Sequence, residues 1–144
     1  MSQPEIHPMQ TGPAVKKASV FFTLVMSVIT LGIYVPYWFI SRREALNRLD
    51  SEVTLPSAPA KIVFILYILS AIFLPVAMIG GEGMMRLYDT LDIPITYGGM
   101  AVCLYLAMRT RLILNEHLGV KSVGPVKTFF LWIWYLQYKI NAHL

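Results

Sequence analysis

The amino-acid sequence predicts an all-α fold, that of a small helical integral membrane protein, and two observations support this prediction. Hydrophobic residues make up 56% of the 144 residues and charged residues 14%, whereas soluble domains contain about 45–50% and about 25%. The apolar residues lie in long blocks, and the charged residues fall in the gaps between them. A chain of this length suggests a single domain.

Residues 1–17 form a polar tail that contains three prolines. Such a composition cannot bury enough apolar surface to build a core. We therefore expect the tail to dock on a neighbouring protein, and residues 18–144 to form one helical membrane domain.

The first apolar block, residues 18–41, carries no charge and contains the stretch TLGIYVPYW. Pro36 has no backbone N–H, and its ring clashes with the carbonyl of Gly32, four residues earlier. Gly32 can absorb this distortion, and the hydroxyl of Thr30 can bond to a freed backbone group. We therefore predict that the helix breaks here, with Pro36 in the first turn of a second helix.

The two middle blocks, residues 62–81 and 95–118, are each long enough to cross a bilayer, because about 20 helical residues span about 30 Å. The second of them contains Arg109 and Arg111, whose long side chains can reach the headgroups. Residues 82–92 lie between the two blocks and read as an acidic loop. We expect two full transmembrane helices here.

The fourth block, FFLWIWYLQY, offers only about ten apolar residues, or about 15 Å of helix. Three arrangements remain open for such a short segment. It lies in the membrane interface, or dips into the bilayer and returns, or completes a crossing with Gln137, Lys139 and Asn141 held against other helices.

The distribution of Lys and Arg favours one topology. If all four blocks cross the membrane, the 12 basic residues divide eight to four between the two sides. If the first and fourth blocks instead enter and leave on the same face, every basic residue except Arg86 is cytoplasmic. The positive-inside rule favours the second arrangement, with segments 42–61 and 109–127 cytoplasmic and the acidic loop 82–92 outside. A four-helix transmembrane bundle is the alternative.

Two short motifs resemble a known family. TLGIYVPYWF and, near the C-terminus, YLQYKIN resemble the paired T-L-G-I-Y…Y-W and Y-L-Q…I-N elements of the small bacterial membrane family called domain of unknown function 4234. The resemblance implies a multi-pass protein of the bacterial inner (cytoplasmic) membrane with no assigned activity and no catalytic residue. The signature positions in this chain are Thr30, Gly32, Tyr34, Tyr37, Trp38, Leu136, Gln137 and Asn141.

Small residues recur at helical spacing on the two middle blocks. Such residues let helix backbones approach closely, so we expect them to face each other or a partner. They are Ser70, Ala77 and Gly81 on the first of these blocks, and Gly99, Cys103 and Ala107 on the second.

Three polar side chains are candidates for other roles. Gln137 and Asn141 lie one helical turn apart, and we expect them to form interhelical hydrogen bonds. Glu82 follows a pair of glycines at the end of a spanning block, where a carboxylate can bind a cation or relay protons. An ordinary residue of the outer loop is the alternative for Glu82.

The sequence shows no motif for catalysis or cofactor binding. It contains no P-loop, dinucleotide fingerprint, metalloprotease helix or nucleophile elbow. Its three histidines lie in polar flanks, His117 at the polar end of the block 95–118, and Cys103 is its only cysteine. We expect no cofactor held by side-chain ligation, no catalytic site and no metal site, only contacts with lipid or detergent. The basic residues border apolar blocks, which indicates membrane orientation rather than nucleic-acid binding.

The sequence leaves two functions open. The first is a non-enzymatic structural or accessory subunit of a larger bacterial membrane complex of the respiratory, photosynthetic or secretion type, acting through helix packing and tail docking with other membrane subunits. The second is a small oligomeric channel or transporter in which residues 30–38 form a re-entrant element.

Overall fold

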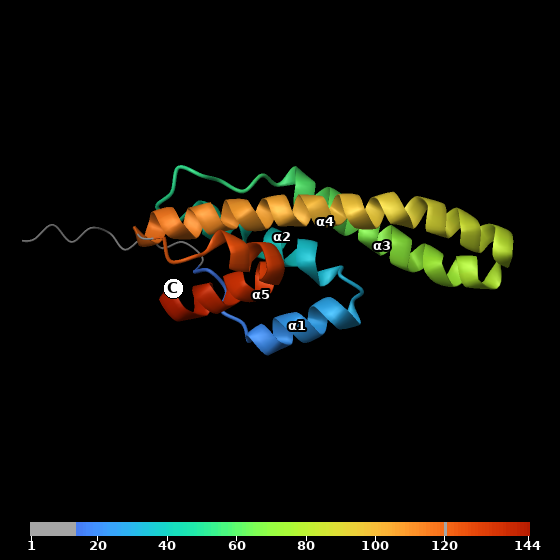
Figure 1. Cartoon of the computed structure of the whole chain (residues 1–144), viewed down its shortest axis with the longest axis horizontal. Coiled ribbons are helices and arrows are strands. Elements are labelled where there is room, and N and C mark those ends of the chain that lie inside the picture. The colour runs from blue at the N-terminus through green and yellow to red at the C-terminus, as the bar shows by residue number, and fades with distance from the viewer. Residues whose placement is uncertain (1–13, 120) are drawn as a thin grey trace, which may run out of the picture.

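A computed structural model describes residues 14–119 and 121–144 of the chain (Figure 1). Over these residues it contains helices and no strand, so the predicted all-α class is confirmed. The tail docking predicted for residues 1–17 falls largely on residues outside the described part. The helices are α1 (Val20–Ile29), α2 (Tyr34–Asn47), α3 (Ala58–Ile79), α4 (Glu82–Leu118) and α5 (Pro125–His143).

Helices α3 and α4 form a long antiparallel pair, joined by a tight turn at Gly80 and Gly81. Within the described residues, these two helices are long and apolar enough to cross a membrane. Only 11% of the apolar window of α3 and 22% of that of α4 are buried. A core helix of a soluble protein is mostly buried, so these two helices differ from such a helix in their exposure.

The predicted acidic loop over residues 82–92 is wrong: these residues are the first three turns of α4. Gly81 has a φ of 82°, so it completes the turn by itself, and the next helix begins at Glu82. Tyr88 and Asp92 face α3 and form hydrogen bonds with Ser70. These polar side chains form their hydrogen bonds between α3 and α4. Residues 82–92 can therefore be helical rather than a loop.

The predicted break in the first apolar block is confirmed, and it lies between α1 and α2 at residues 30–33. The backbone reverses through two left-handed residues, Leu31 with a φ of 52° and Gly32 with a φ of 88°. The hydroxyl of Thr30 donates to the carbonyl of Met26 at 2.6 Å and accepts the backbone N–H of Tyr34 at 3.0 Å. This one side chain therefore caps both helices at the break.

Replacing Gly32 by alanine is expected to lower the free energy of unfolding by about 1 kcal/mol, because an L-residue in the left-handed region crowds its own carbonyl. The nearest side-chain atom to a new Cβ, on the Tyr67 ring, lies 3.8 Å away, so the cost is conformational and not a clash. Unfolding of the purified protein by sodium dodecyl sulfate in mixed micelles measures the change. Equal stability of the two proteins would contradict the strained turn.

Helix α5 is also broken, at Trp132, whose φ of 42° and ψ of −127° are not helical. The hydroxyl of Tyr135 accepts the backbone N–H of Gly124 at 3.2 Å. In a straight helix these two residues would lie about 16 Å apart along the axis. The segment therefore reverses its direction at Trp132.

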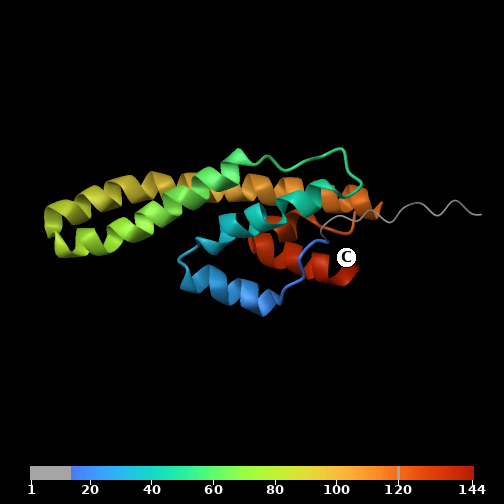
Figure 2. The same ribbon diagram turned by 180° about the vertical axis from the view of Figure 1, so that it is seen from behind.

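The two broken segments pack on the same part of the α3–α4 pair. Helices α1, α2 and α5 lie beside the half nearest the α2–α3 loop, and the other half stands clear of them (Figures 1 and 2). The alternative four-helix bundle is not formed, because α1 has only 10 residues and α5 is broken at Trp132. Both described chain ends lie at the end of the molecule opposite the α3–α4 turn.

The α2–α3 loop is fixed to the last turns of α4. The guanidinium of Arg109 donates to the carbonyl of Thr54 at 2.9 Å. The carboxylate of Glu116 accepts hydrogen bonds from the hydroxyl of Ser51 and the backbone N–H of Glu52. The Ser51 hydrogen bond is the main reason that the pKa of Glu116 is lowered.

Candidate functional site

The two family motifs meet in the folded chain, although they are 99 residues apart in sequence. The indole N–H of Trp38, in α2, donates to the side-chain carbonyl of Gln137, in α5, at 2.8 Å. Both side chains are fully buried. This hydrogen bond joins one broken segment to the other.

The second motif also holds the segment that precedes α1. The amide of Asn141 donates to the carbonyl of Ala18 at 2.7 Å. The amide of Gln137 donates to Asn141 at 3.0 Å and to the carbonyl of Lys16 at 3.4 Å. The interhelical hydrogen bond predicted for Gln137 is thus present, with Trp38, whereas Asn141 bonds to the segment before α1 and not to another helix. Together the two side chains fix the backbone next to Lys17.

The other residues of the first motif divide between the core and the surface. Tyr34 and Pro36 are buried, and Pro36 lies in the first turn of α2. Leu136 is buried in the same core as Trp38. Tyr37 is exposed, and its ring lies tilted against that of Phe64 of α3, with 6.1 Å between the ring centres.

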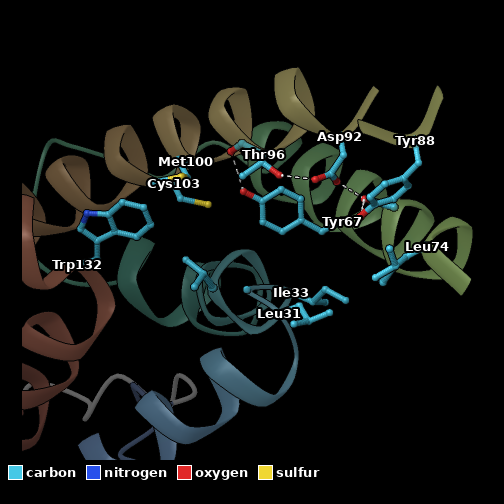
Figure 3. Close-up of a pocket in the computed structure, with 14 residues that line it drawn as sticks. Leu31, Ile33, Tyr67, Leu74, Tyr88, Asp92, Thr96, Met100, Cys103 and Trp132 are labelled. Atoms are coloured by element: carbon cyan, nitrogen blue, oxygen red, sulfur yellow. Dashed lines mark hydrogen bonds between the residues drawn. The ribbon is translucent and has the colours of Figure 1, made fainter. Parts of the chain in front are cut away.

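A cavity of about 470 Å³ lies where the tips of the two broken segments approach the middle of α3 and α4 (Figure 3). Leu31 and Gly32 line it from the first tip, and Trp132 lines it from the second. The exposed side chains of Leu31 and Met100 form part of its rim. The remaining lining residues are Ile33, Val35, Tyr67, Ser70, Ala71, Leu74, Tyr88, Asp92, Thr96 and Cys103.

One carboxylate, that of Asp92, lines this cavity opposite the middle of α3. The hydroxyl of Ser70 donates to one carboxylate oxygen, and the hydroxyl of Thr96 donates to the other at 3.2 Å. The hydroxyl of Tyr88 lies 3.2 Å from that of Ser70, and it donates there because the Ser70 proton points to Asp92. Two hydroxyl groups therefore bond directly to the carboxylate, and that of Tyr88 extends the network through Ser70.

Tyr67 forms the side of the cavity beneath this network (Figure 3). Its hydroxyl donates to the backbone carbonyl of Thr96 at 3.3 Å. The aromatic rings of Tyr67 and Trp132 therefore line the same cavity as the carboxylate of Asp92.

Asp92 is not among the site residues predicted from the sequence, because residues 82–92 are predicted to form a loop. A usable signal was present: Tyr88, Asp92 and Thr96 follow one another every four residues, and this spacing places them on one face of a helix. Pro94 and the neighbouring acids obscured the helical pattern.

The predicted small-residue stripes pack within the chain. Ala77, Cys103 and Ala107 are buried. A Cβ on Gly99 would lie 2.4 Å from the hydroxyl oxygen of Tyr67, so only glycine fits against this ring. Ser70 contacts Asp92 rather than another small residue.

Gly81 does not take the helix-packing position that we predicted for it. Gly81 lies in the α3–α4 turn with no atom within 4 Å of a Cβ built on it, so it makes no close helix contact. Glu82 is exposed in the first turn of α4, ten residues before Asp92 along the helix. In the described part of the chain, no three His, Cys, Asp or Glu side chains are placed to hold a metal ion.

The fold and the cavity define a class of helical protein with two helices suited to crossing a membrane and two helical segments that reverse at a break. The chain belongs to the family described as Domain of unknown function (DUF4234), which matches residues 18–144. The family predicted from the two motifs is therefore confirmed. No curated protein and no solved structure matches the chain.

Proposed function

We propose that the chain is a non-enzymatic membrane protein of the transporter or channel class, which binds a lipophilic organic cation at Asp92. The observation that carries the proposal is the position of this carboxylate in a cavity beside the middle of α3, the more apolar of the two long helices. An ionisable group at such a depth is costly and marks a binding or proton-transfer site.

The counter-ion of Asp92 has to come from outside the cavity. No Lys, Arg or His is among the residues that line it. An ionised carboxylate in a bilayer needs a partner of opposite charge, and in this cavity a bound cation can supply it.

The rest of the cavity suits a cation with an apolar body. The rings of Tyr67, Tyr88 and Trp132 supply aromatic surfaces that attract cations. Ligand cavities for drug-sized molecules have volumes of about 300–1,000 Å³, and this cavity falls in that range. Because Leu31 and Met100 at the rim are exposed, a ligand dissolved in the lipid can enter from the side.

The proposal includes a topology. We place α3 and α4 across the bacterial cytoplasmic membrane, with the α3–α4 turn outside and segments 42–61 and 109–127 in the cytoplasm. The contacts of Arg43 with Leu55 and of Arg109 with Thr54 gather basic residues at the end opposite that turn. Both broken segments then enter the bilayer from the cytoplasmic side and reverse near its middle, as helices of half-membrane length do.

The test is binding of tetraphenylphosphonium to the purified protein in detergent, measured by isothermal titration calorimetry. We expect binding, because the cation supplies the charge that pairs with the carboxylate of Asp92. Asp92→Asn should abolish this binding.

Asp89→Asn is the matched control, because it removes the same charge from the exposed side chain of the residue three positions earlier on α4. This variant should bind as the unchanged protein does. No binding by the unchanged protein, or equal binding by Asp92→Asn, would overturn the proposal.

The accessory-subunit hypothesis is a second proposal, and one observation favours it. The half of the α3–α4 pair next to its turn stands clear of the other helices, and Ile72, Val76 and Leu91 are exposed there (Figures 1 and 2). A membrane partner can cover this surface as well as lipid can. Co-purification of one defined complex at fixed stoichiometry would support a subunit, and recovery of the chain alone would exclude it.

A further inference from the structure

A second groove lies between α1 and α2, apart from the cavity at Asp92. Its volume is about 490 Å³. Four of the side chains that line the groove carry a positive charge or a hydroxyl group and form its polar part. Aromatic and aliphatic side chains form its apolar part. The polar part contains Lys16, Lys17, Ser41 and Arg42, and the apolar part contains Phe22, Met26, Ile33, Tyr34, Tyr37 and Phe64.

Arg42 is the unusual residue of this groove. Only 3% of its surface is exposed, and its guanidinium lies 4.8 Å from the centre of the Trp38 ring. Its Nη1 donates to the hydroxyl of Ser41 at 3.1 Å, while its Nε has no hydrogen-bond partner among the described residues. No carboxylate of the described chain forms a salt bridge with it.

A buried guanidinium without a carboxylate requires an anion from elsewhere, because an unpaired buried charge is strongly unfavourable. Two further positive charges, those of Lys16 and Lys17, line the same groove. The backbone of Lys16 and Ala18 is held by Gln137 and Asn141, so the motif residues keep Lys16 and Lys17 at the mouth of the groove. No acidic residue lines the groove.

We propose that this groove is a binding site for one anionic phospholipid of the cytoplasmic leaflet. The phosphate lies among Lys16, Lys17 and Arg42, and an acyl chain lies along Phe22, Tyr37 and their apolar neighbours. Charge complementarity selects the anionic headgroup, and the apolar length of the groove selects a lipid over a free phosphate. The site does not depend on ligand binding at Asp92.

The test is native mass spectrometry of the purified protein with added phosphatidylglycerol or phosphatidylcholine of identical acyl chains. We expect one phosphatidylglycerol to be retained in preference to phosphatidylcholine. Each lysine near a phosphate contributes about fivefold to affinity, so the double variant Lys16→Gln, Lys17→Gln should bind phosphatidylglycerol about 25-fold more weakly. Both lysines lie before α1, so their replacement leaves the helices unchanged.

The matched control replaces Lys121 and Lys127, two exposed lysines outside the groove, by glutamine. It changes the net charge by the same amount, and it should leave the retained lipid unchanged. Equal weakening in both double variants would show non-specific charge attraction and overturn the proposal. Retention of both lipids in equal amounts, or displacement of phosphatidylglycerol by inorganic phosphate alone, would also overturn it.

Discussion

Replacing Gly99 by alanine is expected to lower the free energy of unfolding by about 1–3 kcal/mol, the usual cost of overpacking a helix contact. The new Cβ would lie 2.4 Å from the hydroxyl oxygen of Tyr67 and 2.6 Å from two of its ring carbons. The ring has little room to withdraw, because its hydroxyl group is bonded to the carbonyl of Thr96. Helices α3 and α4 must therefore separate locally.

Gly98 provides the control for this prediction, since it is the preceding residue of the same helix and no atom lies within 4 Å of a Cβ built on it. Gly98→Ala should leave stability unchanged or raise it by up to about 1 kcal/mol, because alanine is the better helix former. Denaturation in mixed micelles compares the two variants. The clash would be refuted if they were equally stable, and Tyr67→Leu should recover part of the loss from Gly99→Ala.

Replacing Gln137 by leucine is expected to cost about 2–3 kcal/mol. The change removes the acceptor of the fully buried Trp38 indole N–H and leaves that donor unsatisfied. It also removes the donor to Asn141 and to the carbonyl of Lys16, so the segment before α1 loses a support. The same unfolding assay measures the loss.

A double-mutant cycle with Trp38→Phe separates the hydrogen bond from packing. In the Trp38→Phe background no indole N–H is left to satisfy, so Gln137→Leu should cost about 1–2 kcal/mol less than it does in the unchanged protein. An equal cost in both backgrounds would mean that packing, and not the Trp38–Gln137 bond, explains the effect.

The break between α1 and α2 could be predicted because its causes are local. Gly32 permits a positive φ, Pro36 removes a donor, and Thr30 has a hydroxyl that can cap. The break at Trp132 has no such signal, since neither glycine nor proline occurs between Pro125 and His143. Sequence periodicity does not report a single residue with non-helical dihedral angles.

The candidate sites were harder to predict than the fold. The sequence predicts that Asp92 lies outside the membrane, because the charged residues of 82–92 hide the helical spacing of this segment. The partners of Gln137 could not be identified, because Trp38 is 99 residues away and no spacing rule connects them. The role of Arg42 depends on which of its neighbours are charged, and only the folded chain shows this.

The unequal lengths of the helices make the protein a wedge in cross-section. The half of the molecule that holds the α2–α3 loop contains parts of all five helices, whereas the half that holds the α3–α4 turn contains α3 and α4 alone (Figure 2). In the topology proposed above, such a body would displace more lipid from the cytoplasmic leaflet than from the outer one. Many copies side by side would then favour a curved membrane with the broad end on its convex surface.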